Sequence, residues 1–255
     1  MDIRAVAFDV NGTLVRILTD DDDERIFRAA AHFLTYQGIE LHRHELRELY
    51  FQIMKEQLRG SPEKYPEFDA VGIWRSIIED HQTDFTRALP AGRLQQIPLF
   101  LAEMARGISR RRLGLYPYVR EVLDFLRDRY PLAIITDAQS AYAHGELHKV
   151  GLLGYFDPII VSGDHGYRKP DPRLFQLALD GMAVAAENTL YVGNDMYRDI
   201  YGAREARLTT VMFDSDQGEK TYRDCTPDYT ITDFRDLPKI LGLTSDAGED
   251  GLQLI

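Results

Sequence analysis

The sequence has little that would link it to a membrane, a nucleic acid or an oxidising compartment. Its only cysteine is Cys225, so the chain cannot form an internal disulfide, which suits a reducing compartment. No apolar run approaches the roughly 18 residues that a membrane-spanning helix needs, and no signal-peptide pattern precedes the first predicted strand. Basic residues are the minority, and the net charge of −11 argues against binding to nucleic acids or anionic membranes. We therefore expect a soluble, cytoplasmic protein with neither kind of partner.

Internal repeats and low-complexity blocks are also absent, while a hydrophobic content of 44% is ample for a packed core. Residues 20–113 show helical apolar spacing almost throughout. From Pro117 onward, short apolar strands alternate with helices, which is typical of a parallel sheet covered on both faces. The predicted strands are residues 3–9, 132–136, 158–161, 189–193, 209–213 and 228–231; the helices between them are near 117–129, 141–150, 172–182 and 197–206.

This alternation predicts an α/β fold with a Rossmann-like three-layer core, a parallel sheet and an inserted helical cap. The core would consist of residues 1–15 and 115–243, and the cap of residues 16–114. The tail, residues 244–255, is expected to be loosely ordered.

Polar residues stand at the ends of the predicted strands or directly after them. Asp9 ends the first strand, Thr136 and Asp137 follow the second, Lys169 follows the third, and residues 194–199 follow the fourth. Ligands of open parallel sheets bind beyond the carboxyl ends of the strands, so we expect these side chains to converge. Carboxylate and amide oxygens suit Mg²⁺, and a lysine would balance a nucleophilic aspartate beside a phosphoryl group.

These four segments resemble the four motifs of the haloacid dehalogenase-like (HAD) hydrolase superfamily, most of whose members are magnesium-dependent phosphatases. The resemblance covers essentially the whole chain, including residues 227–231, which resemble the last strand of the family. It implies that Asp9 is the nucleophile that becomes an aspartyl phosphate. It also implies that Thr136 hydrogen-bonds the phosphoryl oxygens and that Lys169 stabilises the intermediate.

The same resemblance implies a cofactor and a substrate class. Mg²⁺ would be held by Asp9, the backbone carbonyl of Asn11 and Asp195, with Asp199 steadying the metal shell. Gly12 would join Thr136, Asp137 and Lys169 in binding the substrate. That substrate would be a small phosphorylated molecule over which the cap closes. The oligomeric state and the identity of the substrate stay open.

Two positions depart from the pattern. Asn11 stands where phosphatases of the family usually have a second aspartate, which protonates the leaving group and later activates water. Loss of such a general acid–base costs about 10²–10⁴-fold in rate. Asp137 stands where the family commonly has an amide. One hypothesis is that Asp137 takes over the proton transfer; the alternative is coincidence.

Asn11 also leaves two other functions open. The dehalogenase branch lacks the second aspartate and needs no metal, so a metal-free haloacid dehalogenase acting through an aspartyl ester is an alternative. Asp195 and Asp199 weigh against it, because an acidic pair would repel a halocarboxylate. The other alternative is a non-catalytic relative that binds a phosphorylated metabolite or a protein.

Two further clusters favour ordinary surface roles. Arg110-Arg111-Arg112 could guide an anionic substrate, but a solvated hinge is the simpler interpretation. His144 and His148 share a helix face without a third ligand, so a surface helix is favoured over a zinc site.

Overall fold

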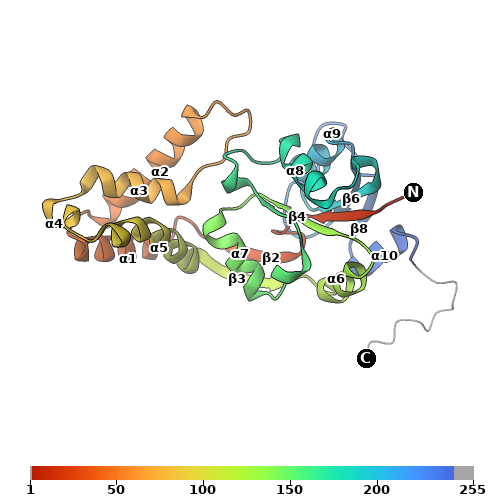
Figure 1. Ribbon diagram of the computed structural model, residues 1–255, viewed down its shortest axis with the longest axis horizontal. Coiled ribbons are helices and arrows are strands. Elements are labelled where there is room, and N and C mark those ends of the chain that lie inside the picture. Colours follow the sequence, from red (N-terminus) through yellow and green to blue (C-terminus); the bar gives the residue numbers. More distant parts are fainter. Residues whose placement is uncertain (1, 244–255) are drawn as a thin grey trace.

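The computed structural model describes residues 2–243 and has two parts, a parallel sheet flanked by helices and a group of helices inserted near the N-terminus (Figure 1). The strands are β1 (Ala5–Phe8), β2 (Val15–Thr19), β3 (Arg110–Leu115), β4 (Leu132–Thr136), β5 (Ile159–Val161), β6 (Thr189–Gly193), β7 (Thr209–Phe213) and β8 (Tyr229–Ile231). The helices are α1 (Glu24–Tyr36), α2 (Arg43–Gly60), α3 (Ala70–His81), α4 (Asp84–Arg87), α5 (Ala91–Ser109), α6 (Val119–Arg127), α7 (Ser140–Lys149), α8 (Pro172–Met182), α9 (Gly202–Glu205) and α10 (Leu237–Ile240). The predicted tail, residues 244–255, lies outside the described residues.

The main sheet is parallel throughout, with strand order β5-β4-β1-β6-β7-β8. Its central strands β4, β1 and β6 are buried along their whole length, as expected for a sheet covered on both faces. The predicted α/β core with a parallel sheet is therefore confirmed, and each of the six strands lies within two residues of its predicted range.

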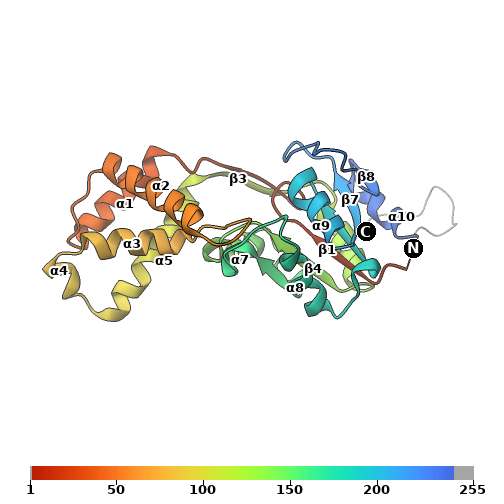
Figure 2. The same ribbon diagram turned by 90° about the horizontal axis from the view of Figure 1, so that it is seen from above.

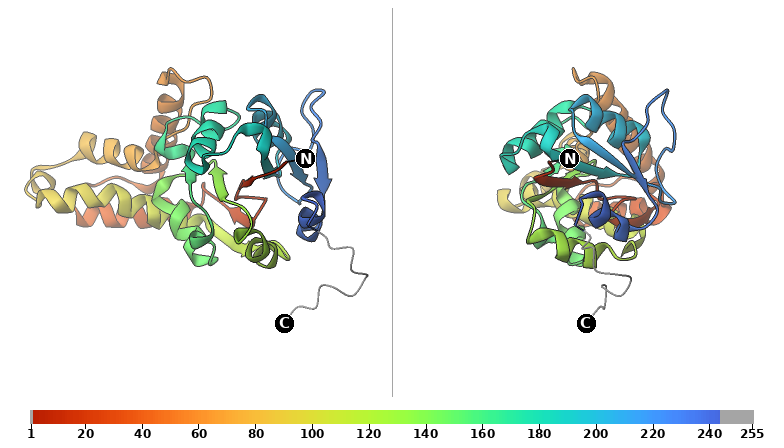
Figure 3. Two further views of the ribbon diagram at one scale, coloured as in Figure 1. Left: turned by 45° about the vertical axis from the view of Figure 1, so that its right-hand side comes forward. Right: turned by 90° about the vertical axis from the view of Figure 1, so that its right-hand side faces the viewer.

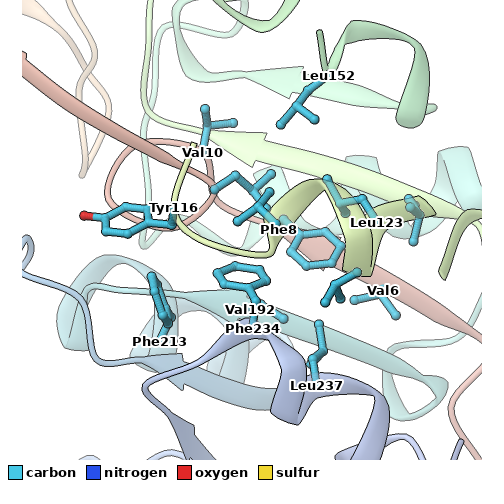
Figure 4. Packing of buried hydrophobic residues seen from close by; sticks show 14 of the residues in the cluster. Val6, Phe8, Val10, Tyr116, Leu123, Leu152, Val192, Phe213, Phe234 and Leu237 are labelled. Carbon is cyan, nitrogen blue, oxygen red and sulfur yellow. The ribbon is translucent and has the colours of Figure 1, made fainter. Parts of the chain in front are cut away.

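Alternate side chains of the strands serve the two faces of the sheet. Phe8 of β1 packs in a cluster with Leu123 of α6 and Leu237 of α10 (Figure 4). Ala7, its neighbour, points to the other face and belongs to a cluster with Phe175 of α8. This period of two is the normal geometry of a strand, and it gives the three-layer arrangement seen from the end in Figure 3.

The helical insertion, residues 20–109, has an apolar core of its own. Phe27, Leu34, Trp74 and Leu101 are fully or almost fully buried in it, and they come from α1, α3 and α5. This cluster is distinct from the two clusters of the sheet. The two parts accordingly lie end to end along the long axis, with the N-terminal end on the side away from the insertion (Figures 1 and 2).

Two strands that the sequence analysis did not predict join the parts. β2 and β3 pair antiparallel, with Val15 opposite Leu115 and Thr19 opposite Arg110. The expected cap over residues 16–114 is therefore not helical at its two ends. Burial alternates along β2, but the sequence hides this period because the exposed Leu18 is apolar. Arg110–Arg112, expected in a hinge, lie within β3.

Two expected helices also differ in detail. The helix expected over 197–206 is a π-helical segment, Met196–Tyr201, that continues into α9. The helix expected from Pro117 begins at Val119, because Tyr118 has a left-handed backbone with φ of 63°. Within residues 2–243, every helix is too short or too polar to cross a membrane.

Candidate active site

Residues that directly follow three neighbouring strands meet at the carboxyl edge of the sheet. Asp9 follows β1, Asp137 follows β4 and Asn194 follows β6, and these strands are adjacent in the order β4-β1-β6. Lys169 comes from the connection between β5 and α8. The four residues line a small cavity of about 30 Å³, whose remaining wall consists of Asn11, Arg198 and Asp199.

Asp9 and Lys169 form the centre of this cavity. Both are almost fully buried, and the Lys169 Nζ donates to Asp9 Oδ1 at 2.7 Å. Burial raises the pKa of Asp9 to about 6, although the nearby lysine lowers it. Burial lowers the pKa of Lys169, but the carboxylates of Asp199 and Asp9 raise it by a larger amount. The pKa therefore lies above its usual value, and the ammonium group stays charged. The pair therefore presents a carboxylate beside a permanent positive charge at neutral pH.

Asp199 holds the lysine from the other side. Its Oδ1 accepts from Lys169 Nζ at 2.6 Å and from the Tyr191 hydroxyl at 3.0 Å. Its Oδ2 accepts from the backbone N–H groups of Asn194 and Asp195, both at 3.0 Å. Since four donors occupy this carboxylate, Asp199 acts as an anchor that positions Lys169.

Asp195, expected to bind metal, is directed away from the cavity. It caps the π-helical segment: Oδ1 accepts from the backbone N–H of Tyr197 and Arg198, and Oδ2 from the Arg198 guanidinium and the N–H of Glu219. Burial raises the pKa of Asp195, but the hydrogen bonds and charge of Arg198 lower it more, so the net shift is downward. The structure thus places Asp195 in this helix cap and not in the cavity wall, and its predicted role as a metal ligand stays a prediction.

Asn194 occupies the position expected for Asp195. Its side chain is 2% exposed, and its Oδ1 lies 2.9 Å from the Thr13 hydroxyl, which is also 3.1 Å from Asp9 Oδ2. Gly12 makes this contact possible: its φ is +90°, and a Cβ there would lie 2.3 Å from the Asn194 amide nitrogen. Gly12 is not part of the cavity wall, so its role is close backbone approach.

Asp137 has one oxygen without a hydrogen bond. Its Oδ1 accepts from the Lys169 backbone N–H at 2.9 Å, whereas Oδ2 is buried without a hydrogen-bond partner among residues 2–243. The nearest cation to Oδ2 is the Arg168 guanidinium, at 3.5 Å. The Thr136 hydroxyl is likewise buried without a partner in the described chain, although Thr136 is not part of the cavity wall. Buried polar atoms are normally paired, so these two atoms point to a ligand.

Comparison with known proteins identifies the family. The sequence model of a family described as haloacid dehalogenase-like hydrolase matches residues 3–207 of this chain. The chain belongs to the haloacid dehalogenase-like hydrolases. It is 34% identical over 174 residues to a phosphoserine phosphatase of Thermus thermophilus, covering 68% of both chains. It is 37% identical over 98 residues to a glyceraldehyde 3-phosphate phosphatase of Pyrococcus abyssi, covering 38% of this chain and 41% of that protein.

Solved structures show the same fold. A 2-haloacid dehalogenase from Pseudomonas syringae superimposes with a TM-score of 0.67 at 22% identity, covering 94% of this chain and 98% of the other. A HAD phosphatase from Thermococcus onnurineus gives a TM-score of 0.57 at 24% identity, with the same coverage. At these identities the likeness establishes the fold and leaves the reaction undecided.

The sequence analysis placed residues 194–199 at the site but gave Asn194 and Arg198 no role of their own, and it assigned no role to Thr13 or Tyr191. Asn194 directly follows its strand, as Asp9 and Asp137 follow theirs. In the sequence, the pattern around Tyr191 predicts an ordinary core residue of a strand, and the pattern around Arg198 predicts an exposed residue of a helix. Neither carries a local signal of function.

The oxygen atoms in the cavity wall could bind Mg²⁺ only together with oxygen atoms of the substrate. The wall contains the carboxylates of Asp9, Asp137 and Asp199 and the amides of Asn11 and Asn194. The Asp199 carboxylate is already bonded to Lys169. Among residues 2–243, no three His, Cys, Asp or Glu side chains are grouped as a metal site. Mg²⁺ can nevertheless bind through one carboxylate together with substrate phosphate and waters. The residues therefore suit a weakly charged magnesium site.

Proposed function

We propose that this HAD-like hydrolase is a phosphatase of small phosphorylated molecules in which Asp9 is the nucleophile. The observation that carries the proposal is the buried ion pair between Asp9 and Lys169, which Asp199 holds in place. The similarity to a phosphoserine phosphatase over about two thirds of the chain supports the same reaction class.

In the proposed reaction, an Asp9 oxygen attacks phosphorus as the bond to the leaving oxygen breaks, forming an acyl phosphate. The leaving group takes the bonding electrons and a proton, and water then attacks the acyl phosphate to release inorganic phosphate and restore Asp9. Lys169 neutralises the charge that gathers on the phosphoryl oxygens. Mg²⁺, held by Asp9, Asn11 and Asn194, would supply further positive charge there.

Proton transfer needs a group other than Asn11, whose amide cannot exchange a proton near neutral pH. We propose that Asp137 takes this role, since it lines the cavity and its buried Oδ2 has no hydrogen bond within residues 2–243. Asp137→Asn is then expected to lower kcat by about 10²–10⁴-fold. Gln176→Ala, on the exposed face of α8, serves as a control. An Asp137→Asn enzyme with normal kcat would overturn this assignment.

A panel of phosphate esters, assayed for phosphate release with and without Mg²⁺, tests the main proposal. We expect magnesium-stimulated release that Asp9→Asn abolishes. Activity that persists in Asp9→Asn would contradict the proposed nucleophile.

A metal-free haloacid dehalogenase is the second candidate, and the geometry removes one objection to it. Asp195 is turned away and Asp199 is neutralised by Lys169, so the cavity does not present the repelling acidic pair inferred from the sequence. Asp9 would attack the carbon that carries the halogen, expel halide, and form an ester that water cleaves. Halide release from 2-haloacids without metal would favour this candidate. No turnover of either substrate class would favour the non-catalytic alternative.

A further inference from the structure

The connection between α2 and α3, residues 61–69, reaches from the insertion to the part of the molecule that contains the main sheet (Figure 2). It forms an antiparallel bridge there between Pro66 and Tyr167, two residues before Lys169. Glu67 directly follows this bridge, and its side chain is only 3% exposed. The insertion thus brings a buried carboxylate close to the active site, although Glu67 is not part of the wall of the active-site cavity.

Two hydrogen bonds fix the Glu67 carboxylate. Its Oε1 accepts from the backbone N–H of Phe68 at 3.1 Å, and its Oε2 accepts from the Ser162 hydroxyl at 2.8 Å. Ser162 is fully buried, and its hydroxyl oxygen accepts from the Ala138 N–H at 3.0 Å. Because Ala138 directly follows Asp137, the carboxylate from the insertion is tied to the backbone beside Asp137.

Glu67 and Asp137 lie beside the same guanidinium group. The Arg168 Nε is 3.9 Å from Glu67 Oε2 and 3.5 Å from Asp137 Oδ2. The longer distance exceeds hydrogen-bonding range, and Asp137 Oδ2 has no hydrogen bond within the described part of the chain. Both carboxylates are buried, whereas the Arg168 side chain is 37% exposed, so the guanidinium is the least constrained of the three groups.

The position of Arg168 decides whether Asp137 Oδ2 stays free. A guanidinium and a carboxylate form strong hydrogen bonds at about 2.7–2.9 Å, so Arg168 would have to approach Oδ2 by less than about 1 Å. The attraction of the fixed Glu67 carboxylate opposes that approach. An oxygen that is bonded to Arg168 would be a poor group for moving a proton, because the positive charge favours the ionised carboxylate.

We infer that Glu67 is a positioning residue of the active site, which holds Arg168 away from Asp137 Oδ2 and so keeps that oxygen available to the substrate. The inference rests on the proposed function, because proton transfer by Asp137 is part of it. The insertion then takes part in the reaction through a side chain that does not line the cavity.

A crystal structure of Glu67→Gln tests the positioning without any turnover. Glutamine keeps the size of the side chain but removes its negative charge, so Arg168 is expected to move to within about 3 Å of Asp137 Oδ2. Glu63→Gln is the matched control, because Glu63 lies in the same connection and pairs with Arg173 of α8. Arg168 should keep its wild-type position in that control. An Arg168 that also keeps its position in Glu67→Gln overturns the inference.

The pH of these experiments is chosen so that Glu67 is ionised in the wild type. Burial raises the pKa of Glu67 by more than Arg168 and the Ser162 hydroxyl lower it. The variants are therefore compared at about pH 8, well above the usual range of a carboxyl group. If Glu67→Gln does not fold, Glu67→Asp takes its place, since the shorter side chain draws the charge away from Arg168.

Steady-state kinetics tests the consequence for the reaction, with the phosphate ester that the wild type hydrolyses fastest. Glu67→Gln is expected to lower kcat at least about tenfold and to keep KM within about twofold, because Glu67 does not touch the substrate. Glu63→Gln should leave both constants unchanged. The double variant Glu67→Gln/Arg168→Gln should recover most of the lost kcat, because the guanidinium that engages Asp137 is gone. A double variant as slow as Glu67→Gln, or slower, would indicate general damage to the site and contradict the inference.

Two further results separate this inference from the proposed function. If the wild type hydrolyses no phosphate ester, the proposed function and the effect of Glu67 on the reaction fail together, and the crystal structure still decides the position of Arg168. If esters are hydrolysed but Asp137→Asn keeps a normal kcat, the role of Glu67 fails while Asp9 stands as the proposed nucleophile.

Discussion

At the scale of single residues, two amides stand in the cavity where carboxylates would add negative charge. Asn11 and Asn194 both line it beside Asp9. We predict that Asn11→Asp raises phosphatase kcat, because it adds a proton donor and acceptor to the one that Asp137 is proposed to supply. Asn194→Asp should instead lower the Mg²⁺ concentration needed for half-maximal activity, because it adds a carboxylate ligand.

Steady-state kinetics of the two variants over a magnesium series separates these effects. Each variant serves as the control of the other, since both add one negative charge to the same cavity. If the two variants changed kcat by the same factor and also changed the magnesium requirement by the same factor, the added negative charge alone would explain both effects. That result would contradict the separate roles assigned to the two amides.

The buried carboxylate of Asp9 predicts a pH-dependent stability. Its pKa is raised to about 6 from an ordinary value of 3.8, so the folded state binds this proton more tightly than the unfolded state. The contribution of Asp9 to stability therefore falls as pH rises from about 4 to about 6, and is level above. The stability of Asp9→Asn relative to wild type should increase across that window.

Urea unfolding of both proteins at a series of pH values measures this difference. Asp233→Asn is a suitable control, because the pKa of Asp233 is lowered, mainly by its hydrogen bond with Arg235. Its effect should run in the opposite direction. A difference between Asp9→Asn and wild type that does not change with pH would contradict the raised pKa.

At the scale of elements, one side chain attaches the connection between α2 and α3 to the sheet. Gln139 is 4% exposed and satisfies the backbone of Phe68 and Ala70. Gln139→Ala should lower the free energy of unfolding by about 1–3 kcal/mol, because two buried backbone groups lose their partners. Hydrogen exchange should also become faster in residues 62–70.

The exposed Gln176, whose side chain donates to Asp180 on its own helix, provides the control for this prediction. Gln176→Ala should change stability by less than about 0.5 kcal/mol. Unaltered exchange in residues 62–70 of Gln139→Ala would show that the backbone pairing of Glu67 with Gly166, and of Arg168 with Tyr65, is sufficient to hold the connection.

At the scale of the whole molecule, the insertion and the main sheet have separate apolar cores. The antiparallel strand pair β2–β3 connects the two parts. Because Thr19 pairs with Arg110, a short glycine–serine turn can replace residues 20–109. We predict that the shortened chain folds with its parallel sheet intact. Its stability should be lower, because Gln139 and Glu146 lose their partners in the insertion.

Circular dichroism and urea unfolding of the shortened chain test this expectation. The transition should stay cooperative, with a smaller m-value because less surface is exposed on unfolding. A chain without a cooperative transition would show that the sheet depends on the insertion for folding.

Sequence alone determined the α/β architecture of this protein. Strands and helices at this length have local signatures, namely short apolar runs for buried strands and apolar spacing of three to four residues for helices. It also located Asp9 and Asp137, because a polar residue at the end of an apolar strand is visible without any contact being known, and it located Lys169 through the resemblance of the four segments to the HAD motifs.

Only the tertiary structure decided which neighbouring side chain faces the cavity. Asn194 and Asp195 are adjacent in the chain, yet one lines the cavity and the other caps a π-helical segment. That choice depends on the backbone donors of residues 197, 198 and 219, which come together only in the fold. The pairing of β2 with β3 is decided in the same way, by contacts between residues far apart in the sequence.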